Sequence, residues 1–136
     1  MKIKILLVVA SIAVICGCAV APGSRAVVVR AEQSISVANA TLDAAVHVDQ
    51  ANRSFFQTNA PGFHAFCEWL REPVIIAPLT NTQPRGLAIV RSADAIKNTF
   101  KASNNTNDYA ALITALALVE QTTSEAQIYL TQIHTH

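Results

Sequence analysis

The feature that most constrains the fold is a regular apolar seam near the end of the chain. Eight residues follow one another in alternating steps of three and four: Tyr109, Leu112, Leu116, Val119, Thr123, Ala126, Leu130 and Ile133. This spacing places them on one side of an α-helix, and only Thr123 interrupts the apolar pattern. Such a seam packs against other helices at a shallow angle. The segment therefore predicts a long helix, and packing within the chain is favoured over an intermolecular coiled coil.

A second long helix is predicted over residues 27–58, which contain neither proline nor glycine and are rich in alanine. One stripe recurs there every three or four positions: Ile35, Ala38, Leu42, Ala45, Asp49, Asn52 and Phe56. A single helix of this length would be about 48 Å long, which favours a bundle. Asn59, Pro61 and Gly62 are expected to end it.

A third helix is predicted from Pro84, which suits a first helical turn, to about residue 102. Its apolar stripe consists of Leu87, Val90, Ala93, Ile96 (or Lys97) and Phe100. Residues 103–107 then form a turn rich in capping residues, and Asp108 falls in the first turn of the last helix. A carboxylate there interacts favourably with the positive end of the helix dipole.

Residues 60–83 are the least regular part. Residues 61–71 are compatible with a short helix, and residues 72–79 form an apolar run that contains two prolines. Because proline cannot donate to a β-ladder, we expect an extended lid there rather than a central strand. The predicted fold is all-α: an antiparallel three-helix bundle with an irregular, aromatic-rich crossover after the first long helix.

The start of the chain has the pattern of an export signal. Lys2 and Lys4 precede an uncharged apolar run, which continues to Ile15-Cys16-Gly17-Cys18. This ending resembles the lipobox of bacterial lipoprotein precursors, with Ile15 and Gly17 as the signal-recognition positions. The resemblance implies that the Cys18 thiol receives a diacylglycerol and that the chain is cut before it. Cys16 departs from the family pattern, in which Ala, Ser or Thr is more usual.

Three other interpretations of this start remain open. Residues 5–21 are uncharged and would just span a bilayer as an uncleaved anchor. The small-x-small residues 19–21 would allow simple secretion, although Pro22 disfavours that cut. The cysteines would otherwise be apolar filler. We favour the lipoprotein interpretation, which divides the chain into a signal peptide (1–17), a lipidated cysteine with its tether (18–26) and a helical domain (27–136).

The lipoprotein resemblance also implies a location. Acyl chains such as palmitate would hold the protein in the cell envelope, and two or more chains anchor stably. Ala19 after the cysteine implies the periplasmic face of the outer membrane in a Gram-negative host. A second resemblance rests on Pro22-Gly23-Ser24, residues 27–33 and the alanine-rich helix with its asparagine-rich turn, which together resemble small phage or prophage helical proteins. It implies a mobile-element origin and no functional residue.

Charge and cysteine content narrow the function further. Without Lys2 and Lys4 the chain keeps eight of its ten basic residues against nine acidic ones, a formal net charge of −1. No block of like charges is present, which disfavours a nucleic-acid or polybasic lipid surface. Cys67 is the one cysteine outside residues 1–18, and its aromatic neighbours favour a buried role over an intermolecular bridge.

The sequence gives no constellation that predicts catalysis, a metal centre or a cofactor site. His47 and Asp49 are two residues apart and would lie on different helix faces. His64 precedes Cys67 by three residues, but a nucleophilic pair needs an orienting group and a cleft. A cleft that holds His64 beside an acidic partner would favour an enzyme. We therefore predict no catalytic residue, no metal and no cofactor.

The most suggestive functional feature is aromatic. Five of the chain's aromatic residues fall within fifteen positions: Phe55, Phe56, Phe63, Phe66 and Trp69. They would either cap the bundle or form a partner surface made by Phe63, Phe66, Trp69 and Arg71. We expect a lipid-anchored, non-enzymatic interaction protein of the envelope, with an unidentified envelope protein as partner. The alternative is an envelope protein that binds a small ligand or lipid in a pocket under residues 72–79.

Overall fold

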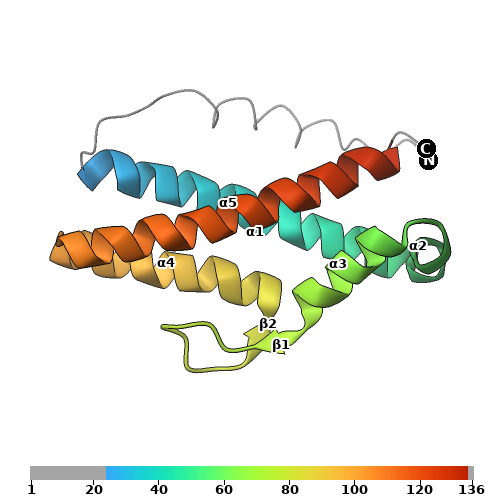
Figure 1. Ribbon diagram of the computed structural model, residues 1–136, viewed down its shortest axis with the longest axis horizontal. Coiled ribbons are helices and arrows are strands. Elements are labelled where there is room, and N and C mark those ends of the chain that lie inside the picture. Colours follow the sequence, from blue (N-terminus) through green and yellow to red (C-terminus); the bar gives the residue numbers. More distant parts are fainter. Residues whose placement is uncertain (1–23, 135–136) are drawn as a thin grey trace.

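The computed structural model describes residues 24–134, which form five helices and one pair of short antiparallel strands (Figure 1). The all-α class is therefore confirmed. In chain order the elements are α1 (Ser24–Ala51), α2 (Arg53–Asn59), α3 (Pro61–Arg71), β1 (Pro73–Val74), β2 (Gln83–Pro84), α4 (Arg85–Ser103) and α5 (Thr106–His134). Among residues 24–134, no helix has both the length and the apolar character needed to cross a bilayer.

The three long helices α1, α4 and α5 contact one another in every pairing. Figure 1 shows them side by side, with α4 running opposite to α1 and α5, while α2, α3 and the strands connect α1 to α4. The predicted seam of α5 faces this contact, since Leu112, Leu116 and Val119 are buried. The sequence prediction for this helix is confirmed.

Small residues allow α1 to approach its neighbours closely. Ala31, Ala38 and Ala45 recur at every seventh position, and all three are fully buried. An alanine on a helix surface leaves room for the side chains of the facing helix, such as Leu112 and Leu116 of α5. The interface therefore combines alanine on α1 with larger apolar residues on its partners.

The prediction of one uninterrupted helix over 27–58 is wrong. The helix begins earlier, at Ser24, and ends at Ala51, after which Asn52 takes a non-helical conformation (φ −137°, ψ 42°) and α2 begins. This bend lets Phe56 of α2 pack against Phe63 of α3, with ring centroids 5.0 Å apart. The chain therefore bends at Asn52 without a proline or glycine, and the aromatic contact between α2 and α3 accompanies the bend.

The crossover is more ordered than the sequence suggested. The short helix compatible with residues 61–71 forms as α3, and β1 then pairs with β2, with Pro73 opposite Pro84. Pro84 therefore lies in this strand and precedes α4, which begins at Arg85 rather than at Pro84. The prediction of an extended, non-central segment after Arg71 agrees with this two-residue pairing. The Arg85 backbone N–H donates to the Glu72 carbonyl at 2.9 Å and ties the crossover to the start of α4.

The turn between α4 and α5 follows the prediction closely. Asn104 adopts the left-handed conformation (φ 50°), which asparagine tolerates better than most residues. The Asn105 side-chain oxygen accepts a hydrogen bond from the Asp108 backbone N–H at 2.8 Å. The Asp108 carboxylate in turn accepts a hydrogen bond from the side-chain NH2 group of Asn105 at 2.9 Å. This reciprocal pair caps the start of α5.

Candidate functional site

The densest group of charged side chains lies where the end of α1 meets α3. We call it the Asp49 cluster; it consists of Asp49, Arg53, His64, Glu68 and Arg71. Asp49 comes from the last turn of α1 and Arg53 from α2, while the other three lie on one side of α3. The spacing of four and three residues along α3 brings His64, Glu68 and Arg71 onto neighbouring positions of that helix.

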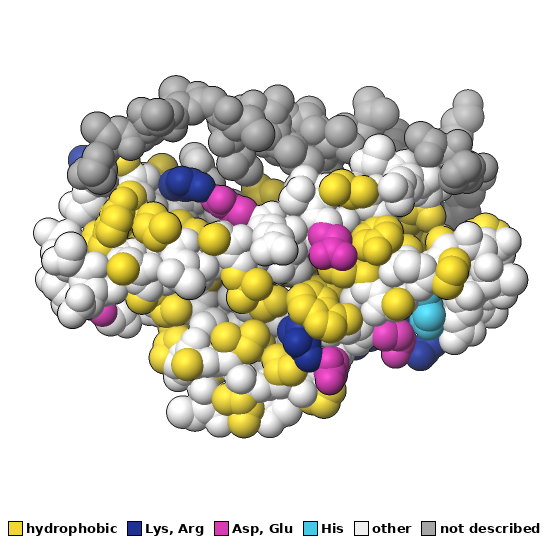
Figure 2. Space-filling view, in the orientation of Figure 1, with side chains coloured by type: hydrophobic (Ala, Val, Ile, Leu, Met, Phe, Trp, Pro, Cys, Tyr) yellow, Lys and Arg dark blue, Asp and Glu magenta, His cyan; other side chains and the backbone are white. Residues whose placement is uncertain are grey.

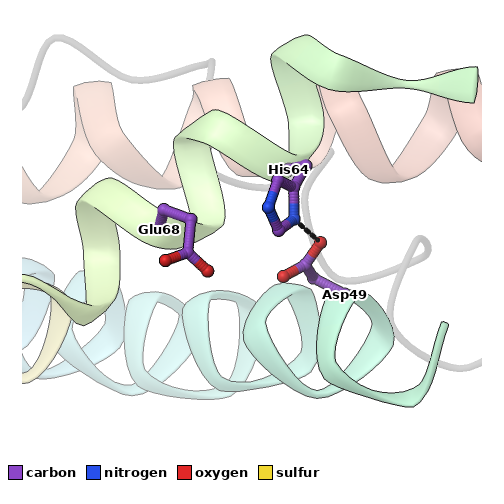
Figure 3. Close-up of side chains that lie close together, drawn as sticks. All are labelled: Asp49, His64 and Glu68. Carbon is purple, nitrogen blue, oxygen red and sulfur yellow. Dashed lines mark hydrogen bonds and ion pairs between the residues drawn. The ribbon is translucent and has the colours of Figure 1, made fainter. Parts of the chain in front are cut away.

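Asp49 is the centre of this cluster and is fully buried, with an exposed fraction of 0%. Its Oδ1 lies 2.7 Å from His64 Nδ1, and its Oδ2 accepts a hydrogen bond from an Arg71 guanidinium nitrogen at 2.7 Å. Figure 3 shows the Asp49 carboxylate of α1 directed toward the His64 ring of α3. A buried carboxylate is tolerated only when it is paired and hydrogen-bonded, and both oxygens of Asp49 are.

Glu68 extends the cluster toward solvent. Its carboxylate forms ion pairs with Arg71 and, at 2.9 Å, with Arg53. The Arg71 guanidinium therefore contacts both carboxylates, Asp49 and Glu68. Two carboxylates, those of Asp49 and Glu68, therefore face two guanidinium groups, those of Arg53 and Arg71.

This arrangement bears on metal binding. Asp49, His64 and Glu68 each offer one ligand atom, and these atoms all lie within 4.8 Å of one another. However, Arg71 already supplies the positive charge that both carboxylates need. A divalent cation at these atoms would have to compete with the guanidinium groups of Arg53 and Arg71 for the same two carboxylates. The geometry thus favours a buried ionic link between α1 and α3 over a metal centre.

Cys67 lies beside the cluster and has the buried role expected from its aromatic neighbours. Its thiol donates to the Ala45 carbonyl of α1, with Sγ and O 3.5 Å apart. Burial, reinforced by the charge of Asp49, raises the pKa of the Cys67 thiol to about 12. The thiolate is the nucleophilic form of cysteine, so this thiol is poorly suited to nucleophilic chemistry at neutral pH.

Six of the eight aromatic residues form one continuous series of ring contacts, which we call the aromatic chain, while Phe100 and Tyr109 form a separate pair. Successive ring centroids lie 5.0 to 6.0 Å apart in the order Phe55, Phe56, Phe63, Tyr129, Phe66 and Trp69. Tyr129 comes from α5 and joins the α2–α3 rings to the long helices. Contacts at these separations stabilise beyond the apolar area that they bury.

The structure corrects the partner surface expected from the sequence. Phe63 and Phe66 are buried and belong to the core, because the bend at Asn52 folds α2 and α3 back onto the bundle. Arg71 is also largely withdrawn, since its guanidinium contacts Asp49. Of the four expected residues Trp69 is the most exposed, with 37% of its area accessible, while the Arg71 side chain keeps 20%. Cys18, Ile15 and Gly17 lie outside the described residues.

Sequence reasoning missed the pairing of Asp49 with His64 and Arg71. It correctly separated His47 from Asp49, because His47 contacts Asp43 on its own helix. The sequence places Asp49 in the apolar stripe of α1, but no partner for its carboxylate was predicted. A carboxylate on a buried helix face requires a basic or hydrogen-bonding partner, and this requirement could have predicted that Asp49 pairs with residues of another helix.

At the surface, Trp69 lies next to a charged pair. The guanidinium carbon of Arg85 is 4.8 Å from the Trp69 ring centroid, and Arg85 also forms an ion pair with Glu72. Ile75, which follows β1, is 62% exposed. Figure 2 shows hydrophobic side chains gathered over the end of α3 and the β1–β2 segment, beside basic and acidic side chains. We call Trp69, Glu72 and Arg85, together with the exposed Ile75 three residues after Glu72, the Trp69 patch.

Comparison of the chain with protein-family models, with curated proteins and with solved structures finds no match.

Proposed function

We propose that this protein is a lipid-anchored, non-enzymatic interaction protein of the bacterial cell envelope. In this proposal Cys18 carries the lipid, and α1, α4 and α5 act as an antiparallel three-helix scaffold for a protein-binding surface. The anchor rests on the resemblance of residues 15–18 to a lipobox. The partner would be another envelope protein, and the membrane contact would come from acyl chains on Cys18.

The observation that carries the binding role is the Trp69 patch. Trp69 and Ile75 expose apolar area, while Arg85 and Glu72 supply paired charges beside Trp69. Tryptophan and arginine are the residues most enriched among those that dominate binding energy at protein interfaces. Part of the Trp69 ring stays available, whereas Asp49, His64, Arg71 and Cys67 are engaged in contacts within the domain.

The length of the tether supports a position close to the membrane. Ser24, the first residue of α1, comes six positions after Cys18. Fully extended, this stretch reaches about 20 Å at most. A domain held in this way would search only the layer next to the membrane, where the effective concentration of an envelope partner is high. A phage-encoded version would modify the host envelope or exclude superinfecting phage.

Two measurements on the same strains test this proposal. Labelled palmitate should enter the wild-type chain and be absent from the Cys18→Ser variant; label that persists in the variant would disprove the anchor. Crosslinking of the tagged full chain in cells should give a discrete partner that Trp69→Ala removes. Ile128→Ala is the matched control, because Ile128 is an exposed apolar residue on α5 outside the Trp69 patch. Loss of the partner in both variants, or in neither, would contradict the assigned surface.

A further inference from the structure

A cavity of about 550 Å³ lies where α2, the start of α3 and the last turns of α5 meet. Its volume is in the range of sites that hold small molecules. The cavity is lined by Phe55, Asn59, Ala60, Gly62, Phe63, Tyr129, Gln132 and Ile133. It is distinct from the Trp69 patch and from the Asp49 cluster, neither of which contributes a lining residue.

The chemistry of the lining defines the class of ligand. None of these eight described residues carries a formal charge at neutral pH. A charged ligand would lose its hydration there without gaining an ion pair, which is unfavourable. The amide groups of Asn59 and Gln132 make the lining partly polar but uncharged, and the Asn59 side-chain NH2 donates to the Phe55 carbonyl at 2.9 Å.

The lining also contains three aromatic rings, from Phe55, Phe63 and Tyr129. Phe55 is 56% exposed, so much of its ring is available to a ligand. Phe63 is only 2% exposed, and its ring contacts the Tyr129 ring with centroids 6.0 Å apart, so Phe63 mainly holds the Tyr129 ring in place. Rings held in this way offer offset and edge contacts to another ring. We propose that this cavity binds a neutral, apolar small molecule that contains an aromatic ring.

The proposed site is independent of the proposed anchor. The 28 residues of α1 are about 42 Å long, and α2, which lines the cavity, follows the end of α1 opposite Ser24 (Figure 1). The six Cα–Cα steps from Cys18 to Ser24 can span about 20 Å at most, which is less than half the length of α1. Loss of the anchor would therefore leave the ligand site in place, and the two proposals can fail separately.

Gly62 provides a way to fill the cavity without disturbing the fold. A Cβ atom at this position would lie 3.5 Å from the Tyr129 hydroxyl oxygen, which is an ordinary van der Waals contact. Gly62→Ala should therefore be accommodated with most of the cavity retained. Gly62→Leu would place a larger side chain in the cavity, and both substitutions raise the helix propensity of the first turn of α3.

The test uses benzophenone, a neutral aromatic ketone that inserts into nearby C–H bonds on irradiation. The full-length chain in membranes is irradiated with increasing benzophenone, and labelled residues are identified by mass spectrometry. We expect saturable labelling concentrated on Phe55, Phe63, Tyr129 and Ile133. Gly62→Ala should keep it, and Gly62→Leu should reduce it at least tenfold. Ala111→Leu, which adds similar bulk at an exposed position of α5, should leave it unchanged.

Three results would overturn the proposal. The first is labelling that rises without saturation and falls equally on exposed apolar residues such as Val29 and Ile113. The second is labelling that Gly62→Leu leaves intact while its circular dichroism spectrum matches wild type. The third is labelling that occurs only after other envelope proteins are removed. That result would mean that a side chain of another protein, and not a small molecule, fills the cavity in the membrane. If Gly62→Leu fails to fold, the wild-type chain decides the question: labelling that does not saturate, or that falls outside the cavity residues, overturns the proposal.

Discussion

Arg71 and Asp49 lie 22 residues apart in the sequence, and the Arg71 guanidinium donates to Oδ2 of the fully buried Asp49 carboxylate at 2.7 Å. This contact joins α3 to the end of α1 across two bends of the chain. His64 contacts the other oxygen of the same carboxylate, so two residues of α3 hold one residue of α1. The position of α3 on the bundle therefore depends on a charged link as well as on apolar packing.

Removing Arg71 should destabilise the domain strongly. In Arg71→Ala the buried Asp49 carboxylate would keep only His64 as a partner, and breaking a buried pair typically costs about 3 to 5 kcal/mol. We expect a loss of about 3 kcal/mol in the free energy of unfolding, measured by urea titration of the full chain with circular dichroism.

Arg53→Ala is the control for this experiment. Arg53 pairs with Glu68 at 2.9 Å but is 52% exposed. Exposed ion pairs contribute about 1 kcal/mol or less, so this variant should remain close to wild type. A loss in Arg71→Ala as small as that expected for Arg53→Ala would show that the buried Asp49 carboxylate does not depend on Arg71.

The parts of the fold that follow from local pattern were predictable from the sequence. The seam of α5 repeats over seven steps, and the cap formed by Asn105 and Asp108 lies within four residues. In both cases the geometry of a single helix determines which residues share a face or can form a hydrogen bond. Neither prediction requires knowledge of where another element lies.

The candidate sites depend on contacts that no local pattern encodes. Asp49 meets His64 only because the chain bends at Asn52 and again at Ala60. Those same bends bury Phe63 and Phe66 and leave Trp69 partly exposed. The sequence identified the aromatic residues but not which side of α3 would face the core. That side is determined by the packing of α3 against α1 and against Tyr129 of α5.

Burial of Cys67 predicts slow alkylation. Its thiol is fully buried and its pKa is raised to about 12, so almost no thiolate is present at pH 8 in the folded chain. We expect iodoacetamide to modify Cys67 at least 100-fold more slowly in the folded chain than in urea. The measurement follows the Cys67 peptide by mass spectrometry, which separates it from Cys16 and Cys18. Similar rates in both states would mean that the α1–α3 interface opens readily.

The same pKa shift predicts a loss of stability at alkaline pH. Folding raises the pKa of Cys67 from its ordinary value of 9.0 to about 12, so the unfolded chain releases this proton first. The stabilising contribution is complete below pH 9 and is lost as the pH rises from 9 toward 12. In wild type, the free energy of unfolding should therefore fall more steeply over this range than in Cys67→Ala. Parallel curves for the two chains would assign the alkaline loss to lysine and tyrosine residues instead.

The close approach of α1 to its neighbours gives a last prediction. Ala38 is fully buried in the main core cluster, midway between Ala31 and Ala45 on the same face of α1. Leucine at this position would add three carbons where the neighbouring helices leave no space, and overpacking typically costs about 1 to 3 kcal/mol. Ala40→Leu is the matched control, because Ala40 is exposed on the same helix and leucine has nearly the same helix propensity. We expect Ala38→Leu to lower the urea midpoint clearly and Ala40→Leu to leave it near wild type. Two unchanged midpoints would mean that α1 can shift outward at little cost, and that its alanine face does not set the helix spacing.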